Sequence, residues 1–121
     1  MAEHNILGKK GEELAKQFLV ENTYKIRHLN WRYKKTEIDI IAEKNNLLVV
    51  VEVKTRTNDY FENPKEAVTF KKQKNIIDTT EAYIEKFNVD LEVRFDIISV
   101  TFENGKEKIE HIEDAFQAGL Y

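Results

Sequence analysis

The chain has 121 residues, of which 41% are hydrophobic and 34% charged, and this length and composition predict one soluble globular domain over residues 1–121. The absence of cysteine excludes disulfides and thiolate zinc sites, and the three histidines are too scattered to indicate a metal site, so any metal should be bound by oxygen. No segment has the apolar length of a membrane span or of a signal peptide, which predicts a cytoplasmic protein without a membrane partner.

The formal net charge of −3 conceals a segregation of charge along the chain. Residues 25–74 carry twelve Lys or Arg against seven acids, whereas residues 75–121 carry four against eleven. The segment KIRHLNWRYKK (25–35) has five basic residues and no acid, with Trp31 and Tyr33 between them. This mixture suits contacts with phosphates and stacking on bases, and the alternative is a solvated surface with chance clustering.

The first element should be a helix from about Asn5, a suitable N-cap, to about Glu21. Gly8 and Gly11 lie toward its apolar side and would allow close approach to a sheet. A helical projection places Glu12 at the border of that side and Glu13 toward solvent. The apolar side is formed by Leu7, Leu14, Ala15, Phe18 and Leu19.

A strand over residues 24–33 should lead into a β-hairpin over residues 36–56. Asn45 and Asn46 are suited to a two-residue turn with positive φ angles, and a turn there makes the numbers of each opposed pair sum to 91. This register places Asp39 opposite Glu52 and Glu37 opposite Lys54, on one face of the sheet.

The second half should contain a helix and a further strand. NPKE (63–66) has the pattern of a helix start with Asn63 as the N-cap, and the helix should end near Phe87, with a break near Thr69 or Phe70. Its inward residues should be Ile76, Ile77, Tyr83 and Ile84. A strand over residues 93–102 follows, which makes the predicted order α-β-β-β-α-β, and the acidic tail could add a short element.

Two opposed carboxylates on a half-buried sheet destabilise the fold unless positive charge lies between them. In one interpretation a basic residue such as Lys54 or Arg56 supplies that charge and the cluster is a structural ion network. In the other, the charge is a hard divalent cation, because Mg²⁺ favours one or two carboxylates together with water and substrate oxygens. The main-chain carbonyl of Val53 could complete the protein ligands.

Five segments, in this order and spacing, resemble the YraN-like family of small bacterial proteins. They are GKKGEELA (8–15), NWRYKKTEID (30–39), VVVEVKTR (49–56), NPKEAVTFKKQ (63–73) and RFDII (94–98). That family is placed in the PD-(D/E)xK nuclease superfamily, near archaeal Holliday junction resolvases. The resemblance implies a restriction endonuclease-like α/β core, a mixed sheet flanked by helices.

The resemblance also implies roles for individual residues. Asp39, Glu52 and Lys54 occupy the acid and lysine positions of the nuclease signature, and Glu12 matches the helix-one glutamate of resolvase-like members. Asp39, Glu52 and Val53 would bind Mg²⁺ or Mn²⁺, Lys54 would orient the attacking water or stabilise charge, and Glu12 could bind a second ion or a water on the metal. The family usually has glycine at the position of Thr36, which is the one departure.

Several basic residues and one glutamine are candidates for contact with the DNA backbone, with a solvated surface as the alternative for each. They are Arg32, Lys34, Lys35, Arg56, Lys71, Lys72, Gln73 and Lys74.

Two functions remain open from the sequence. The first is a metal-dependent endonuclease acting on DNA, of branched or otherwise structured form by analogy with the resolvases, for which a homodimer would match a two-fold junction. The second is a non-catalytic module that keeps the nuclease fold and binds nucleic acid or a protein partner. The complete set of Asp39, Glu52 and Lys54 favours the first, because a binding module has no evident need of opposed carboxylates.

Overall fold

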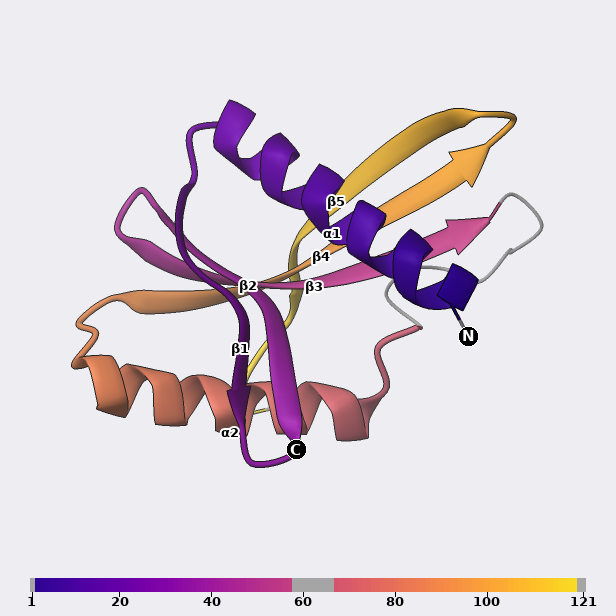
Figure 1. The fold of residues 1–121 in the computed structure, drawn as a ribbon. Helices are drawn as coiled ribbons and strands as arrows, with labels where there is room; N and C mark the ends of the chain where they lie inside the picture. The colour runs from indigo at the N-terminus through magenta and orange to yellow at the C-terminus, as the bar shows by residue number, and fades with distance from the viewer. Residues whose placement is uncertain (1, 58–66, 120–121) are drawn as a thin grey trace.

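The computed structural model describes residues 2–57 and 67–119, with side chains from Ile6 onward. Five strands form one mixed sheet in the order β1-β2-β3-β4-β5, in which β3 and β4 are parallel and all other neighbours are antiparallel. Helix α1 crosses one face of the sheet and α2 crosses the other (Figure 1). The elements are α1 (Ala2–Glu21), β1 (Lys25–Tyr33), β2 (Thr36–Lys44), β3 (Leu47–Thr57), α2 (Phe70–Phe87), β4 (Glu92–Glu103) and β5 (Lys106–Phe116). No helix of the described segments is long and apolar enough to span a bilayer.

Two predictions about the ends of the chain are wrong. Helix α1 begins at Ala2, so Asn5 lies inside the helix and is not its N-cap; alanine and glutamate before it are good helix formers that let the helix start earlier. The predicted order also lacks a strand, because the acidic tail forms the 11-residue β5. Asn104 and Gly105, with φ angles of 49° and 77°, form the turn that returns the chain along β4.

Helix α2 begins at Phe70. Thr69 is its N-cap, and its side-chain oxygen accepts a hydrogen bond of 3.2 Å from the backbone N–H of Lys72. The predicted start at residues 63–66 lies outside the described residues, and the predicted break at Thr69 or Phe70 is the point where the helix begins. Asn88, with a φ of 52°, ends it in the left-handed conformation.

The predicted hairpin register is confirmed from Lys44–Leu47 to Ile40–Val51, where each pair sums to 91. Asn45 and Asn46 form the turn with φ angles of 52° and 62°. In the described chain the β2–β3 ladder ends at Ile40 and Val51, so the expected ladder pairs of Asp39 with Glu52 and of Glu37 with Lys54 do not occur. Strand β2 instead continues beside β1, and it leaves β3 at Asp39.

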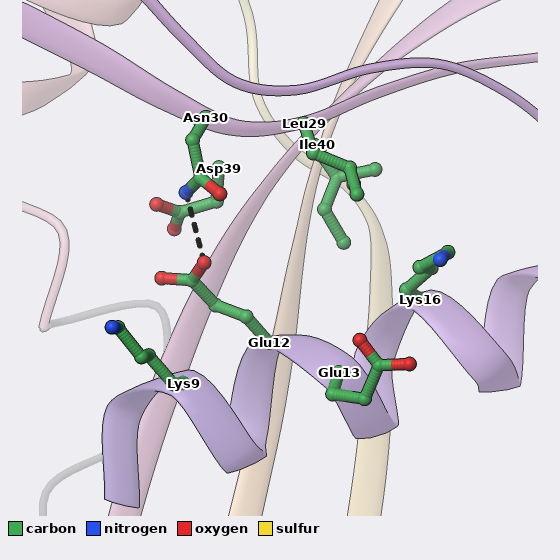
Figure 2. Close-up of a pocket in the computed structure, with 8 residues that line it drawn as sticks. All are labelled: Lys9, Glu12, Glu13, Lys16, Leu29, Asn30, Asp39 and Ile40. Atoms are coloured by element: carbon green, nitrogen blue, oxygen red, sulfur yellow. Dashed lines mark hydrogen bonds between the residues drawn. The ribbon is translucent and has the colours of Figure 1, made fainter. Parts of the chain in front are cut away.

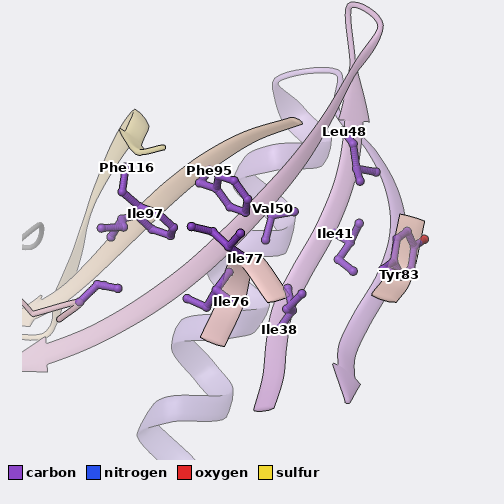
Figure 3. Packing of buried hydrophobic residues seen from close by; sticks show 11 residues of the cluster. Ile38, Ile41, Leu48, Val50, Ile76, Ile77, Tyr83, Phe95, Ile97 and Phe116 are labelled. Carbon is purple, nitrogen blue, oxygen red and sulfur yellow. The ribbon is translucent and has the colours of Figure 1, made fainter. Parts of the chain in front are cut away.

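Each helix covers a separate apolar cluster on its face of the sheet. Beneath α2, Ile76, Ile77 and Tyr83 pack against strand residues including Ile38, Val50 and Phe95 (Figure 3). Beneath α1, the buried residues are Ala15, Leu19, Tyr24, Ile40, Ala42, Val49, Val51, Ile98 and Val100. The inward residues predicted for both helices are therefore confirmed except Leu7, which is half-buried and outside both clusters.

Gly11 allows α1 to approach β3, as the sequence predicts, whereas Gly8 has open space around it. A Cβ at Gly11 would overlap Oγ1 of Thr55, but a Cβ at Gly8 would have no neighbour within 4 Å. We expect Gly11→Ala to lower the free energy of unfolding by about 1–3 kcal/mol through overpacking. The matched control Gly8→Ala should raise it by up to about 1 kcal/mol, because alanine is the better helix former. Urea unfolding of the two variants checks this, and equal effects would contradict the close approach.

Candidate metal and nucleic-acid site

Asp39 lies where strand β2 leaves β3 while it continues beside β1. Ile38 belongs to the cluster under α2 and Ile40 to the cluster under α1, although residues two apart on a regular strand share a face. On the neighbouring strand, Asn30 has a positive φ of 51°. This local kink in β1 and β2 separates β2 from β3 and leaves room for the Asp39 side chain between them.

The Asp39 carboxylate takes the place of a backbone partner for β3. Its Oδ2 accepts a hydrogen bond of 2.8 Å from the N–H of Val53. In an extended strand the N–H and C=O of one residue point to the same side, so the Val53 carbonyl also faces the Asp39 side of β3. The two predicted ligands therefore meet at the gap where the β2–β3 ladder ends.

The side chain of Glu52 lies close to that of Asp39, as expected, although the two residues are not a ladder pair, and it is only 6% exposed. Burial, followed by the negative charge of Glu52, raises the pKa of Asp39 to about 9, and the hydrogen bond from Val53 opposes the rise only in part. Without a cation, the folded protein thus favours a protonated Asp39 that can donate to Glu52. A positive charge close to both carboxylates would therefore stabilise the ionised form of the pair.

Two lysines approach Glu52 from different elements. Nζ of Lys72, on α2, lies 3.4 Å from Glu52 Oε2, and Nζ of Lys54, on β3, lies 3.9 Å from the same atom. Across the described residues, neither these lysines nor any other basic side chain forms an ion pair with Asp39. Within the described segments, the structural ion network considered from the sequence therefore reaches Glu52 but does not include Asp39.

Glu12 borders the same site, and Glu13 is exposed, as the helical projection predicts. Glu12 Oε1 accepts a hydrogen bond of 2.8 Å from Nδ2 of Asn30, and the charge of Glu12 further raises the pKa of Asp39 (Figure 2). Asn30 was not predicted; an asparagine inside a strand pattern, which tolerates positive φ, was the available signal. The cavity between these side chains measures about 240 Å³ and is lined by Lys9, Glu12, Glu13, Lys16, Leu29, Asn30, Asp39 and Ile40.

The donor set fits a hard divalent cation. Two adjacent carboxylates, one buried and one half-buried, and a carbonyl are oxygen ligands of the kind that Mg²⁺ and Mn²⁺ prefer. Over residues 2–57 and 67–119, no three His, Asp or Glu side chains gather closely enough to hold a metal by themselves. A cation at Asp39 and Glu52 would therefore need water and substrate oxygens as further ligands, which is the usual arrangement for Mg²⁺.

The predicted phosphate-contacting residues divide into two groups. Arg32, Lys34, Lys35, Lys71 and Lys74 are exposed, on the end of β1, its turn to β2 and the start of α2. The other three have local roles or lower exposure: Lys72 contacts Glu52, the Gln73 amide donates to the carbonyl of Val68, and Arg56 is half-buried on β3.

The first turns of α2 concentrate positive charge beside the acids. Lys71, Lys72 and Lys74 follow the N-cap, and the first turn contains no acidic residue. Cations are unfavourable at a helix N-terminus, which itself carries partial positive charge. The arrangement raises the potential next to Glu52 and favours an anionic ligand such as a phosphate.

Thr36 fits its position without glycine. Its backbone lies outside the left-handed region, in which the preceding turn residue Lys34 has a φ of 55°. Thr36 also pairs regularly with Tyr33 at the end of β1 and β2. The departure from the glycine usual in the resembled family therefore leaves the local backbone intact.

Comparisons with known proteins agree with the resemblance at the level of the family. Residues 11–100 match the model of a family described as "Uncharacterised protein family UPF0102". A UPF0102 protein of Phocaeicola vulgatus is 56% identical over 121 residues, which are 100% of both chains. A UPF0102 protein of Bacteroides thetaiotaomicron is 51% identical over 100% of both chains. One of Christiangramia forsetii is 49% identical over 96% of this chain and 98% of its own.

Proposed function

This chain belongs to the UPF0102 family, and we propose that it is a metal-dependent endonuclease of the restriction endonuclease-like PD-(D/E)xK class that hydrolyses DNA phosphodiester bonds. The proposal depends chiefly on one observation, the half-buried Asp39 placed against Glu52 with no basic side chain of the described segments paired to it. Two such carboxylates cost stability in the metal-free protein, and a site that binds a cation and a phosphate gives them a reason to be together.

Each residue of the site has a role in this reaction. Asp39, Glu52 and the Val53 carbonyl would hold Mg²⁺, which supplies a Lewis acid that activates water and stabilises charge on the phosphodiester. Lys54 and Lys72 lie on the Glu52 side and would bind the non-bridging oxygens or orient the water. Glu12, anchored by Asn30, would orient a second water or a second ion.

A cleavage assay on linear, flapped and four-way DNA tests the proposal. We expect cutting with Mg²⁺ or Mn²⁺ and none with EDTA, and Glu52→Gln should reduce the rate by at least about a hundredfold, because it removes one of the two carboxylate ligands. Binding of DNA without cutting in every metal would support the non-catalytic module instead.

The exposed lysines of the β1–β2 turn should carry part of the binding to DNA. Replacement of Lys34 and Lys35 by glutamate is expected to weaken binding across sequences and to make its salt dependence less steep, because fewer counterions are released. Lys106→Glu with Lys108→Glu, exposed positions on β5, makes the same charge change and should have a smaller effect. Affinity for DNA measured at several salt concentrations checks this. Similar losses of affinity in both double variants would mean that only the net charge of the protein matters, and not the position of the lysines.

A further inference from the structure

A groove runs along α2 outside the Asp39 site. Its wider part, about 680 Å³, lies between the β1–β2 turn and the first half of α2 and is lined by Tyr33, Lys34, Lys35, Thr36, Asn75, Asp78 and Thr79. A second hollow of about 260 Å³ is lined by Tyr33, Ala82, Glu85 and Lys86. The two hollows share Tyr33, and we call them together the α2 groove.

The α2 groove leads away from the candidate active site. Its helical residues recur once per turn, at Asn75, Asp78–Thr79, Ala82 and Glu85–Lys86, so they form one stripe along α2. Lys72, which contacts Glu52, lies one turn before Asn75 on the same stripe. From Lys72 to Lys86 the helix rises about 21 Å, at about 1.5 Å per residue. A linear ligand bound at Glu52 would have this groove as its continuation.

Tyr33 offers an aromatic surface in the middle of the groove. Its side chain is 40% exposed, and its ring is parallel to that of Trp31, with 3° between the planes and 6.3 Å between centroids. The Trp31 ring packs edge-to-face against the buried Tyr83, with 5.1 Å between the ring centroids. Such a supported ring is suited to stacking with a nucleobase, and Lys34 Nζ lies 5.4 Å from its centre.

The charges of the groove distinguish an unpaired strand from a duplex. Lys34 and Lys35 lie on the turn side, whereas the helix side carries two acids, Asp78 and Glu85, and one base, Lys86. Carboxylates repel the phosphates of a duplex, but they accept hydrogen bonds from the amino groups of exposed bases. A base can reach a tyrosine face only outside the stacked duplex.

We propose that the α2 groove binds an unpaired segment of the substrate strand, with one nucleobase stacked on Tyr33. This inference rests on the proposed nuclease function, and it assigns the substrate class: DNA that is single-stranded on one side of the cut, such as a flap or a splayed arm. Phosphates follow the lysines of the turn, and base edges face Asn75 and Asp78.

Binding without cleavage tests the groove separately from the chemistry. In EDTA, a single-stranded oligonucleotide of about 15 nucleotides carrying 2-aminopurine is titrated with protein, and its fluorescence should fall as the base stacks. Tyr33→Ala should weaken this binding by about 5- to 150-fold, the equivalent of one lost base–aromatic stack. Tyr33→Phe should bind like the wild type, and so should Val20→Ala, an exposed truncation on α1. Binding of the paired form of the same oligonucleotide should not depend on Tyr33.

The outcomes separate the two proposals. Tyr33-dependent binding of the single strand with no cutting in Mg²⁺ would overturn the nuclease and retain the groove. Equally fast cutting of paired and partly unpaired DNA, unchanged by Tyr33→Ala, would retain the nuclease and overturn the groove. Equal affinity of Tyr33→Ala and the wild type for the single strand would also overturn it. A melting temperature of Tyr33→Ala close to that of the wild type shows that the comparison concerns folded proteins.

Discussion

Asp39→Asn is expected to abolish both DNA cleavage and the response of the protein to Mg²⁺. Mg²⁺ at ten times its dissociation constant should stabilise the wild type by about 1.4 kcal/mol, which corresponds to a rise of about 3–6 °C in melting temperature. The asparagine variant should show no rise, because one of the two carboxylate ligands is lost. Melting curves of both proteins with Mg²⁺ and with EDTA make the comparison.

The same substitution should stabilise the metal-free protein. The pKa of Asp39 is raised, through burial and then the charge of Glu52, to about 9. A folded-state pKa above the unfolded value means that the native state binds the proton more tightly, so the free energy of unfolding of the metal-free wild type should fall as pH rises from about 4 to about 9. Asp39→Asn removes this part of the pH dependence and should melt higher than the wild type at pH 8 in EDTA.

A structural ion network gives the opposite result for both measurements. If Asp39 served only to neutralise nearby lysines, its replacement would lower stability and Mg²⁺ would have no effect on either protein. Asp90→Asn, in the exposed connection between α2 and β4, controls for the loss of one negative charge and should keep the Mg²⁺ response. If Mg²⁺ did not change the melting temperature of the wild type without DNA, but the wild type cut DNA in the presence of Mg²⁺, the missing metal ligands would come from the substrate.

Local patterns predicted the parts of the fold that local physics determines. Asn45 and Asn46 favour the turn that they form, and the alternation beside them fixes the register as far as Ile40 and Val51. The same register correctly placed Asp39 near Glu52. It could not show that β2 leaves β3 there, because the kink depends on the positive φ of Asn30 on the next strand.

Other features depend on contacts distant in sequence. Strand β5 was expected to be at most a short element because its apolar residues are few and, apart from the buried Phe116, only half-buried, although Asn104 and Gly105 mark its turn. In the sequence, Lys72 is one of several lysines at the start of a helix. Only the crossing of α2 over the sheet brings it to Glu52. Asp96 lies in a segment that looks like an ordinary strand, yet it has the most extensive hydrogen bonding of the described carboxylates.

Asp96 fastens an irregular part of the sheet. Its side chain is fully buried, and it accepts hydrogen bonds from Arg94 at 2.8 and 2.9 Å and from the backbone N–H of Asp114 at 3.0 Å. His111 Nε2 lies 2.8 Å from Oδ2. Between the pairs Phe95–Phe116 and Ile97–Ile112, one residue of β4 opposes three of β5, and Asp114 has a φ of 53°. The carboxylate thus replaces the ladder hydrogen bonds that this bulge lacks.

Asp96→Asn should therefore be strongly destabilising without affecting the metal site. It leaves the guanidinium of Arg94, 19% exposed, without its buried partner, and loss of one member of such a pair costs about 3–5 kcal/mol. Glu113→Gln is the matched control, because Glu113 pairs with the same arginine at 3.4 Å but is 60% exposed, and its loss should cost less than about 1 kcal/mol. Urea unfolding distinguishes the two variants, and the Mg²⁺ response should persist in both.

The pH dependence of this effect has the opposite sign to that of Asp39. Burial alone would raise the pKa of Asp96, but hydrogen bonds from His111, Arg94 and Asp114 outweigh it and lower the pKa below its ordinary value. A lowered folded-state pKa contributes stability that is present above the unfolded pKa, about 3.9, and is lost as pH falls through the folded value. The difference in unfolding free energy between wild type and Asp96→Asn should thus be full at pH 7 and shrink below about pH 4. A difference that stayed constant down to pH 2 would mean that the carboxylate charge is not what holds β5 against β4.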